Sequence, residues 1–150
     1  GNMIEIALYQ PDIPPNTATI MRFAACLDLT VHIIEPTGFL WSEKSFRRAG
    51  MDYIDTARIV RHASWQAFCQ AMVGKRIVLA TTSSDTAYTD FSFTGDDILL
   101  FGRESAGVPE TVHQSADARI TIPLKPGLRS LNVAMACAMI AGEALRQTSS

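Results

Sequence analysis

The chain has 150 residues, of which 47% are hydrophobic and 19% are charged. This composition excludes a disordered or collagen-like protein and a small disulfide-rich fold. Thirteen Lys and Arg against 15 Asp and Glu give a formal charge of −2, which argues against a protein that coats nucleic acid through bulk charge. No repeat, low-complexity segment or Pro/Gly/Ser-rich linker divides the sequence, so we expect one domain over residues 1–150.

The cysteines and the apolar stretches indicate the cellular compartment of the protein and whether it spans a membrane. Cys26, Cys69 and Cys137 are odd in number, widely spaced and flanked by apolar residues. We therefore expect small core residues in a reducing compartment, by default the cytoplasm, and neither a disulfide framework nor a zinc site. The longest uncharged apolar stretch, residues 133–142, is about half the ~20 residues of a transmembrane helix, so no membrane span is expected.

Short apolar runs rich in β-branched residues recur along the chain and predict buried strands. They lie at residues 4–9, 31–34, 77–81, 98–101 and 120–122. Segments with helical spacing lie between and after them, with the expected helices beginning near Asn16 or Thr17, Ser42, Ser64 and Asn132 and ending near Leu27, Gly50, Gly74 and Gln147. This alternation predicts an α/β fold with a mostly parallel sheet and helices on both faces, in which ligands bind beyond the carboxyl ends of the strands.

Common cofactor and catalytic motifs are missing from the sequence. It contains no G-x-G-x-x-G after the first strand, no phosphate-binding G-x-x-x-x-G-K-[ST], no G-x-S-x-G and no H-E-x-x-H. His32, His62 and His113 show no spacing typical of metal ligands, so we expect structural or surface histidines and no metal site.

Three unusual stretches remain as candidate functional segments. Residues 11–16 hold three prolines between a strand and a helix, and Arg22 follows about two turns later. Residues 100–109 run from a strand into a loop with two glycines and a carboxylate, and residues 120–132 open onto the final helix. Taken singly, they fit an ordinary turn, a glycine turn and a helix N-cap as well as they fit ligand-binding loops.

Taken together, the stretches resemble the SPOUT superfamily of RNA methyltransferases. Within it, the chain is similar to the small TrmL/YibK-type enzymes that methylate the ribose 2′-hydroxyl of the wobble cytidine or uridine of tRNA. The resemblance covers almost the whole chain, including Pro-x-Ile-Pro-Pro-Asn-Thr at 11–17, Glu-Pro-x-Gly-Phe at 35–39, Arg-Arg-Ala-Gly-x-Asp-Tyr at 47–53, Phe-Gly-x-Glu-x-x-Gly-x-Pro at 101–109, and Ile-Pro with Arg-Ser-x-Asn at 122–132. The three candidate stretches occur in the same order as in the family along one collinear chain, which makes the resemblance specific.

The resemblance implies a deep C-terminal trefoil knot, a homodimer, S-adenosylmethionine as cofactor and a tRNA anticodon loop as substrate. A knot could not have been inferred from periodicity, because general topology rules treat knots as essentially absent. By the same resemblance the cofactor residues are Ala80, Thr81, Gly102, Glu104, Ile122, Ser130 and Leu131, the catalytic residue is Arg22 with Asn16 before it, and the RNA-binding residues include Arg47, Arg48 and Asn132.

The chemistry of arginine limits the role of Arg22. Methyl transfer to a ribose requires the attacking 2′-oxygen to lose a proton, but a guanidinium has a pKa above 12 and is normally only a donor. We therefore expect Arg22 to hold the adjacent phosphate and stabilise the developing alkoxide. A wider basic group, which consists of Lys44, Arg47, Arg48, Arg58, Arg61 and His62, is the expected RNA-facing surface, although such charges often form only a solvated helix face.

Two positions depart from the family pattern, and other functions stay open. Ala18 stands where the family has glycine, and Gly142 stands beside Glu143 where a tyrosine is usual. The alternatives are a ribosomal RNA 2′-O-methyltransferase, a catalytically idle RNA-binding dimer, and a metabolite-binding α/β protein without an RNA partner. The joint presence of Arg22, Glu104 and the motif at 129–132 favours an enzyme over a pure binding module.

Overall fold

The computed structural model describes residues 3–42, 44, 48, 58–128 and 131–149. Within this part of the chain, six strands form one sheet. The strands are β1 (Glu5–Tyr9), β2 (Thr30–Ile34), β3 (Arg58–His62), β4 (Ile77–Ala80), β5 (Ile98–Phe101) and β6 (Ala118–Ile120). All neighbouring pairs are parallel, in the order β3-β2-β1-β5-β4-β6, so the predicted parallel sheet is confirmed.

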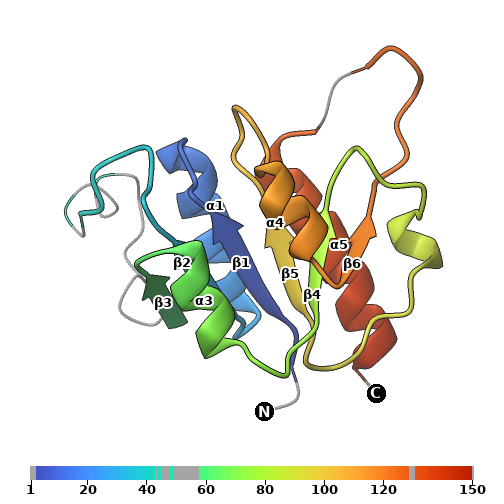
Figure 1. The fold of residues 1–150 in the computed structure, drawn as a ribbon, viewed down its shortest axis with the longest axis horizontal. Helices are drawn as coiled ribbons and strands as arrows, with labels where there is room; N and C mark the ends of the chain where they lie inside the picture. The colour runs from blue at the N-terminus through green and yellow to red at the C-terminus, as the bar shows by residue number, and fades with distance from the viewer. Residues whose placement is uncertain (1–2, 43, 45–47, 49–57, 129–130, 150) are drawn as a thin grey trace.

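Helices cover both faces of the sheet (Figure 1). α1 (Pro14–Cys26) and α5 (Val133–Thr148) pack on one face, while α3 (Trp65–Ala71) and α4 (Glu110–Ser115) pack on the other. A short 3-10 turn, η1 (Tyr88–Asp90), lies in the connection from β4 to β5. Because the central strands are buried on both sides, they are continuous apolar runs and do not alternate with polar residues.

The order of the strands reverses at the centre of the sheet. The chain runs outward from β1 to β2 and β3, then crosses to the other side, where β5 pairs with the free edge of β1. Ala7 of β1 thus has His32 as its partner on one side and Leu100 on the other. Ligand sites in such sheets lie at this reversal, outside the carboxyl ends of the strands. The trefoil knot stays a prediction from the resemblance.

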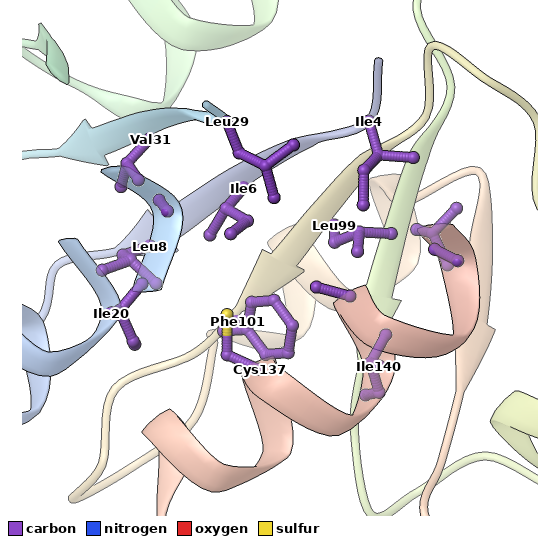
Figure 2. Packing of buried hydrophobic residues seen from close by; sticks show 14 of the residues in the cluster. Ile4, Ile6, Leu8, Ile20, Leu29, Val31, Leu99, Phe101, Cys137 and Ile140 are labelled. Atoms are coloured by element: carbon purple, nitrogen blue, oxygen red, sulfur yellow. The ribbon is translucent and has the colours of Figure 1, made fainter. Parts of the chain in front are cut away.

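The larger core lies between the sheet and the α1/α5 layer (Figure 2). Ile6 and Leu8 of β1 pack with Phe101 of β5, while Ile20 of α1 and Ile140 of α5 cover them from the helix side. Each of these side chains is at most 3% exposed. Burial of one such side chain stabilises the fold by about 1.5–3 kcal/mol, so this layer holds both helices firmly against the sheet.

The helix ends refine the predicted boundaries. α1 begins at Pro14, two residues before the predicted start, because prolines at the first helical positions have no amide hydrogen to leave unbonded and a fixed φ that suits a helix. The Ser64 hydroxyl accepts a hydrogen bond from the Ala67 amide (3.0 Å) and caps α3 as predicted. Asn132 caps α5, since its Oδ1 accepts from the amides of Ala134 (2.8 Å) and Met135 (3.3 Å).

Three elements differ from the prediction or were absent from it. β3 carries exposed Arg58 and Arg61, and this edge strand lacks the apolar run by which the other strands were found. α4 has only six residues, too few to show a helical period. β6 spans Ala118–Ile120, two residues earlier than predicted, and most of the predicted helix beginning at Ser42 lies outside the described residues.

The histidines of β2 and β3 form a buried polar ladder beneath α3. His32 is bonded through Nε2 to Oε1 of Glu5 (2.6 Å) and through Nδ1 to Nε2 of His62 (2.8 Å). Both rings are at most 7% exposed and pack against Phe68. Burial, with the charge of His32 as a second cause, lowers the pKa of His62. These two histidines are structural, and the expectation that His62 faces RNA is wrong.

The expectations about membrane spans and cysteines can be checked on the described residues. No helix among them is long and apolar enough to cross a membrane. Cys26, Cys69 and Cys137 are all free, but only Cys137 is fully buried, so the expectation of three core cysteines holds for one of them. Burial raises the pKa of the Cys137 thiol far above its ordinary range, which makes this thiol unreactive.

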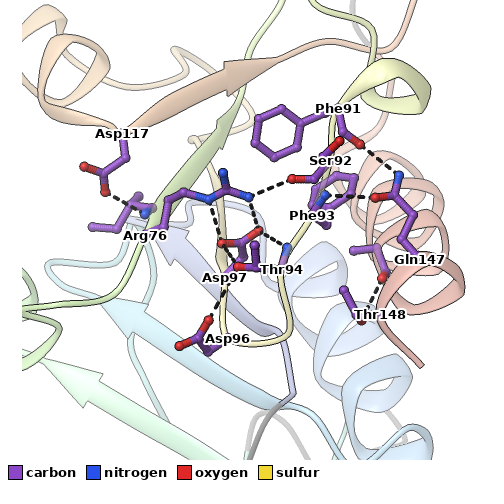
Figure 3. Close-up of polar contacts among 12 residues, drawn as sticks. Arg76, Phe91, Ser92, Phe93, Thr94, Asp96, Asp97, Asp117, Gln147 and Thr148 are labelled. Carbon is purple, nitrogen blue, oxygen red and sulfur yellow. Dashed lines mark hydrogen bonds and ion pairs between the residues drawn. The ribbon is translucent and has the colours of Figure 1, made fainter. Parts of the chain in front are cut away.

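A charged network fixes the amino end of the sheet (Figure 3). Arg76, just before β4, donates from Nε and Nη2 to the two carboxylate oxygens of Asp97 (2.8 and 2.7 Å). The amide and hydroxyl of Thr94 donate to the same carboxylate, which is fully buried just before β5. Burial opposes ionisation, but the hydrogen bonds from Arg76 and Thr94 outweigh it and lower the pKa of Asp97.

Replacing Asp97 should therefore be costly. We expect Asp97→Ala to lower the free energy of unfolding by about 3 kcal/mol, the lower end of the range for a broken buried ion pair, because Arg76 keeps partial access to water. Urea unfolding at neutral pH measures this change. The neighbouring exposed Asp96→Ala should change it by less than about 0.5 kcal/mol, and equal losses for the two variants would contradict the analysis.

Candidate functional site

A cleft of about 890 Å³ opens at the carboxyl ends of β4, β5 and β6. Its walls are the segments that follow these strands, at residues 79–83, 101–108 and 121–124, together with residues 131–140 at the start of α5. Ile13 and Asn16 close it from the side of α1. The volume lies within the roughly 300–1,000 Å³ of small-molecule sites, and the position agrees with the rule for open parallel sheets.

The cleft brings together the described residues that the resemblance assigns to the cofactor. Its lining includes Ala80, Thr81, Gly102, Glu104, Ile122 and Leu131. These residues come from three strand ends and one helix start, and they span more than 50 positions of sequence. Ser130 lies outside the described residues.

The loop after β5 is unusually tight. The amides of Arg103 and Gly107 each donate to the other residue's carbonyl (3.0 and 2.9 Å), so the loop closes on itself. A Cβ on Gly102 would lie 2.7 Å from the Gly107 carbonyl carbon, and Gly107 has a φ of 62°. Both positions therefore require glycine, which predicts that substitution by alanine would deform this wall of the cleft.

The composition of the lining suits a nucleoside-containing ligand. Leu79, Phe101 and Ile122 offer apolar contacts for a flat base, and Thr81 and Ser83 add polar side chains to the same lining. His113 of α4 also contributes to the lining, and its Nε2 atom is buried without a hydrogen-bond partner among the described residues. A buried polar atom of this kind is typical of a site that a ligand completes.

Asn16 and Asn132 join the two helices at one side of the cleft. Asn132 Nδ2 donates to Asn16 Oδ1 (2.9 Å), and both residues line the cleft. The Oδ1 atom of Asn132 is already used to cap α5. The pair therefore fixes the start of α1 against the start of α5, which makes Asn132 part of the cleft wall as well as an N-cap.

Arg22 lies elsewhere in the single chain. It is exposed on α1, about two turns after Asn16, and it is not among the residues that line the cleft. The structure thus brings Asn16 to the predicted cofactor site but leaves Arg22 on the outer surface of the helix.

The expected basic surface is smaller than the sequence indicated. Lys44 and Arg48 are exposed, while Arg47 lies outside the described residues. Arg58 forms an ion pair with Asp28 (2.6 Å), and Arg61 forms one with Glu35 (2.7 Å) while its guanidinium lies over the ring of Trp41. Within the described chain, Arg48 and Lys44 are therefore the members of the group best placed to contact a polyanion.

Some residues of the site were missed in the sequence. Thr82 and Ser83 follow the predicted strand 77–81 directly, so the strand end itself was the available signal. Ala136 and Ile140 line the cleft from α5, and their four-residue spacing from Asn132 was the signal there. No group of three or more His, Cys, Asp or Glu side chains within the described segments could hold a metal ion.

The two departures from the family pattern are accommodated. Ala18 is 6% exposed and packs in a small cluster with Met21, beside Phe39 and Trp41. Its methyl group therefore faces the protein, not an incoming ligand. Gly142 is exposed on α5, with open space where a side chain would stand.

Comparisons with known proteins assign the chain to a family. A family profile described as "SpoU rRNA Methylase family" matches residues 3–142. A "tRNA (cytidine(34)-2'-O)-methyltransferase" of Beijerinckia indica is 60% identical over 144 residues, which are 95% of this chain and 90% of the relative. A protein of the same name from Escherichia coli K12 is 40% identical over 97% of this chain and 94% of its own length.

Solved structures agree with this assignment. The structure described as "Structural insights into the 2-OH methylation of C/U34 on tRNA" superposes with a TM-score of 0.91 at 38% identity, over 97% of this chain and 96% of that one. Because the profile and these relatives each span more than nine-tenths of the sequence, the chain belongs to the SpoU rRNA Methylase family.

Proposed function

We propose that this protein transfers a methyl group from S-adenosylmethionine to the ribose 2′-hydroxyl of the wobble cytidine or uridine of tRNA. The observation that carries the proposal is the convergence of the family's cofactor residues on one cleft of about 890 Å³ at the strand ends. The names of the relatives at 60% and 40% identity support the nucleotide and the RNA class. A solved SpoU methyltransferase complex with the cofactor AdoMet, 27% identical with a TM-score of 0.81, supports the cofactor, although this chain covers only 58% of that protein.

The residues of the cleft fit the cofactor. Ala80, Thr81, Gly102, Ile122 and Leu131 would hold it, through apolar contacts and through main chain that ends at the sheet edge. When bound, S-adenosylmethionine supplies a methyl group on a positively charged sulfur. Ser130, which the resemblance adds to this set, is part of the proposal on that ground alone.

Arg22 would act on the ribose, not on the cofactor. A guanidinium offers hydrogen-bond donors and no acceptor, so we assign to Arg22 two donor roles: binding the phosphate beside the target ribose, and stabilising negative charge on the 2′-oxygen as its proton leaves. Asn16 and Asn132, joined by their hydrogen bond, would line the path to the same ribose. Phosphate or water would take the proton.

A second copy of the chain would bring Arg22 to a cleft. The outer face of α5 carries an exposed stripe of Met135, Ala138, Met139 and Gly142, in which Met135 is 60% exposed and Met139 is 40% exposed. α1 contacts α5 on the same face of the sheet (Figure 1), and Arg22 is an exposed residue of α1. We propose a homodimer packed through the stripe, in which each Arg22 serves the cleft of the partner, because an exposed apolar stripe of this kind marks an association surface.

The domain organisation, the RNA contacts and the compartment of the enzyme complete the proposal. The chain would act as one domain over residues 1–150, without a metal, and its anticodon-loop substrate would meet the exposed side chains of Lys44 and Arg48. Single-stranded loops are the usual targets of sequence-specific RNA recognition. The three free cysteines support a reducing compartment, and we propose the cytoplasm.

Methyl transfer tests the function directly. Labelled S-adenosylmethionine and tRNA that lacks the modification should yield 2′-O-methylcytidine or 2′-O-methyluridine by nucleoside mass spectrometry. Arg22→Ala should lower kcat about 10²–10³-fold, the usual effect of removing one charge-stabilising donor. Arg22→Lys should remain at least about tenfold impaired, because an ammonium lacks the planar set of donors.

The controls for this experiment separate the alternatives. Near-full turnover by Arg22→Lys would contradict directional recognition by the guanidinium. Incorporation into ribosomal RNA in place of tRNA would overturn the substrate assignment. Cofactor binding without transfer to either RNA would indicate an idle RNA-binding dimer.

Arg48 tests the RNA surface. We expect Arg48→Ala to raise the KM for tRNA about 3–10-fold and to reduce the slope of log KM against log salt by about 0.7–1, as one phosphate contact is lost. Steady-state kinetics at several salt concentrations measure both. Lys75→Ala removes the same charge near the amino end of β4 and serves as the control, so an equal effect would argue against a local RNA contact.

Met139 tests the dimer. Light scattering should give twice the chain mass for the wild type and about the mass of one chain for Met139→Glu, because a charge in an apolar interface is costly to bury. Val73→Glu places the same charge on an apolar side chain that is 82% exposed outside the stripe, and it should leave the mass unchanged. A monomeric wild type would refute the arrangement.

A further inference from the structure

The loops that follow β1 and β5 are bound to each other by their own carboxylates. Glu104 Oε2 accepts hydrogen bonds from the main-chain amides of Asp12 and Ile13, both at 3.1 Å. In return, Asp12 Oδ1 accepts from the Glu104 amide (3.2 Å), and Asp12 Oδ2 accepts from the Ser105 hydroxyl. Each loop therefore supplies one carboxylate and the donors for the other loop's carboxylate, an arrangement called here the Asp12–Glu104 clamp.

A third loop braces the clamp from the other side. The Gly38 amide, beyond β2, donates to the Pro11 carbonyl (2.9 Å). A Cβ on Gly38 would lie 2.5 Å from the Cβ of Asp12, so only glycine allows this approach. The clamp thus gives a structural role to the glycine motif at residues 35–39. This motif contains none of the residues that the resemblance assigns to the cofactor or to RNA.

The clamp also borders the cleft directly. Glu104 and Ile13 are lining residues, and Gly102 and Gly107 of the clamped loop form the tight turn in the same wall. Glu104 Oε2 is held by the two amides, so the carboxyl group at the cleft wall depends on the position of residues 12 and 13. Movement of Asp12 would therefore displace both a wall of the cleft and the carboxyl group in it.

We propose that Asp12 is a positioning residue that acts through Glu104: the Asp12–Glu104 clamp fixes the loop at residues 102–107 in the shape that binds the cofactor. This inference rests on the proposed function for the identity of the ligand. The clamp itself is a property of the chain without ligand, so the two can be tested separately.

The clamp contains two carboxyl groups and one proton near neutral pH. Burial, and then the hydrogen bond with Asp12, raises the pKa of Glu104 to about 7, while the same contact with Glu104 lowers the pKa of Asp12. Below pH 7 a neutral Glu104 meets an ionised Asp12, and above it two like charges face each other. An acid whose pKa is raised in the folded state stabilises that state at low pH and loses this contribution as pH rises through the raised value. The clamp should therefore loosen on the alkaline side.

The other charged groups near the clamp do not neutralise its second negative charge. Arg103 donates from Nε to the Gly107 carbonyl (2.9 Å), and its guanidinium lies over the ring of Tyr9. Glu110 and His113 line the cleft from α4. The segment 36–39 beyond β2 contributes no titratable side chain.

Binding of S-adenosylhomocysteine, the demethylated cofactor, measures the role of the clamp. By titration calorimetry, Asp12→Ala should weaken binding about tenfold at neutral pH, as charge-assisted hydrogen bonds are lost. Wild-type affinity should fall by up to about tenfold as the pH rises by one unit through the pKa of Glu104, since one pKa unit corresponds to that factor. Asp12→Asn should flatten this pH dependence, because it removes the negative charge that faces Glu104. Burial would then be the one remaining cause of the raised pKa of Glu104.

Amide hydrogen exchange of the ligand-free protein tests the clamp without any ligand. The amides of residues 102–107 should exchange faster in Asp12→Ala, and also in Gly38→Ala, whose added methyl group displaces Asp12 without changing its chemistry. Asp28→Asn is the matched control. Asp28 is exposed at the opposite end of β2 with a φ of 59°, which asparagine tolerates. The Asp28→Asn variant should therefore match the wild type in amide exchange at residues 102–107 and in affinity for S-adenosylhomocysteine.

The outcomes distinguish the two levels of the proposal. Wild-type exchange and wild-type affinity in both Asp12→Ala and Gly38→Ala would overturn the positioning role. A wild-type chain that fails to bind S-adenosylhomocysteine would overturn the proposed function, while the exchange data would still decide the clamp. If Asp12→Ala lowers the Tm strongly, the pH profile of Asp12→Asn decides, because a purely structural role would leave that profile unchanged.

Discussion

The parallel pairing of β1 with β5 is the constraint on which the cleft depends. Because these strands lie side by side in register, the loops that follow them leave the sheet at the same edge. Hydrogen bonds between residues 91 to 93 positions apart can then form at that edge. The chemistry of the site is therefore a product of strand order, and no local segment of sequence contains it.

The carboxylates at the two ends of the sheet have different partners. At the amino end, Asp97 is fully buried but matched by the Arg76 guanidinium and by Thr94, which gives a charge-balanced and rigid contact. At the carboxyl end, Asp12 and Glu104 meet without a cation between them, so a proton takes the place of the second charge. Stability is concentrated where no ligand binds, and the less balanced pair lies where the ligand is proposed to bind.

Much of the fold was predictable from the sequence, because β1, β2, β4 and β5 are apolar runs and α5 has a clear helical period. The edge strand β3 was not, since its Arg58 and Arg61 face solvent and only its pairing with β2 makes it a strand. The strand order was also hidden, because it depends on which edges meet after collapse. Family motifs pointed to the loops that line the cleft, but the contact of Asp12 with Glu104 joins two motifs and is visible only in three dimensions.

The same logic applies to the basic surface. Counting charges between residues 44 and 62 suggested one RNA-facing group, but the fold commits Arg58 and Arg61 to acidic partners and buries His62 with His32. Charge in sequence becomes available charge only after intramolecular pairs are subtracted. Among the described members of that group, this leaves Lys44 and Arg48 as the exposed cations, so their placement matters more than the number of charges in the sequence.

The central position of β1 also has a consequence for biosynthesis. β2 can pair with β1 early, but β5 follows about 90 residues later, which takes roughly 5–20 s at ordinary translation rates. During that interval one edge of an apolar strand, Ile6 to Leu8, has no partner. Unpaired apolar edges are sites of aggregation, so a nascent chain of this topology exposes such an edge until the second half of the sheet is made.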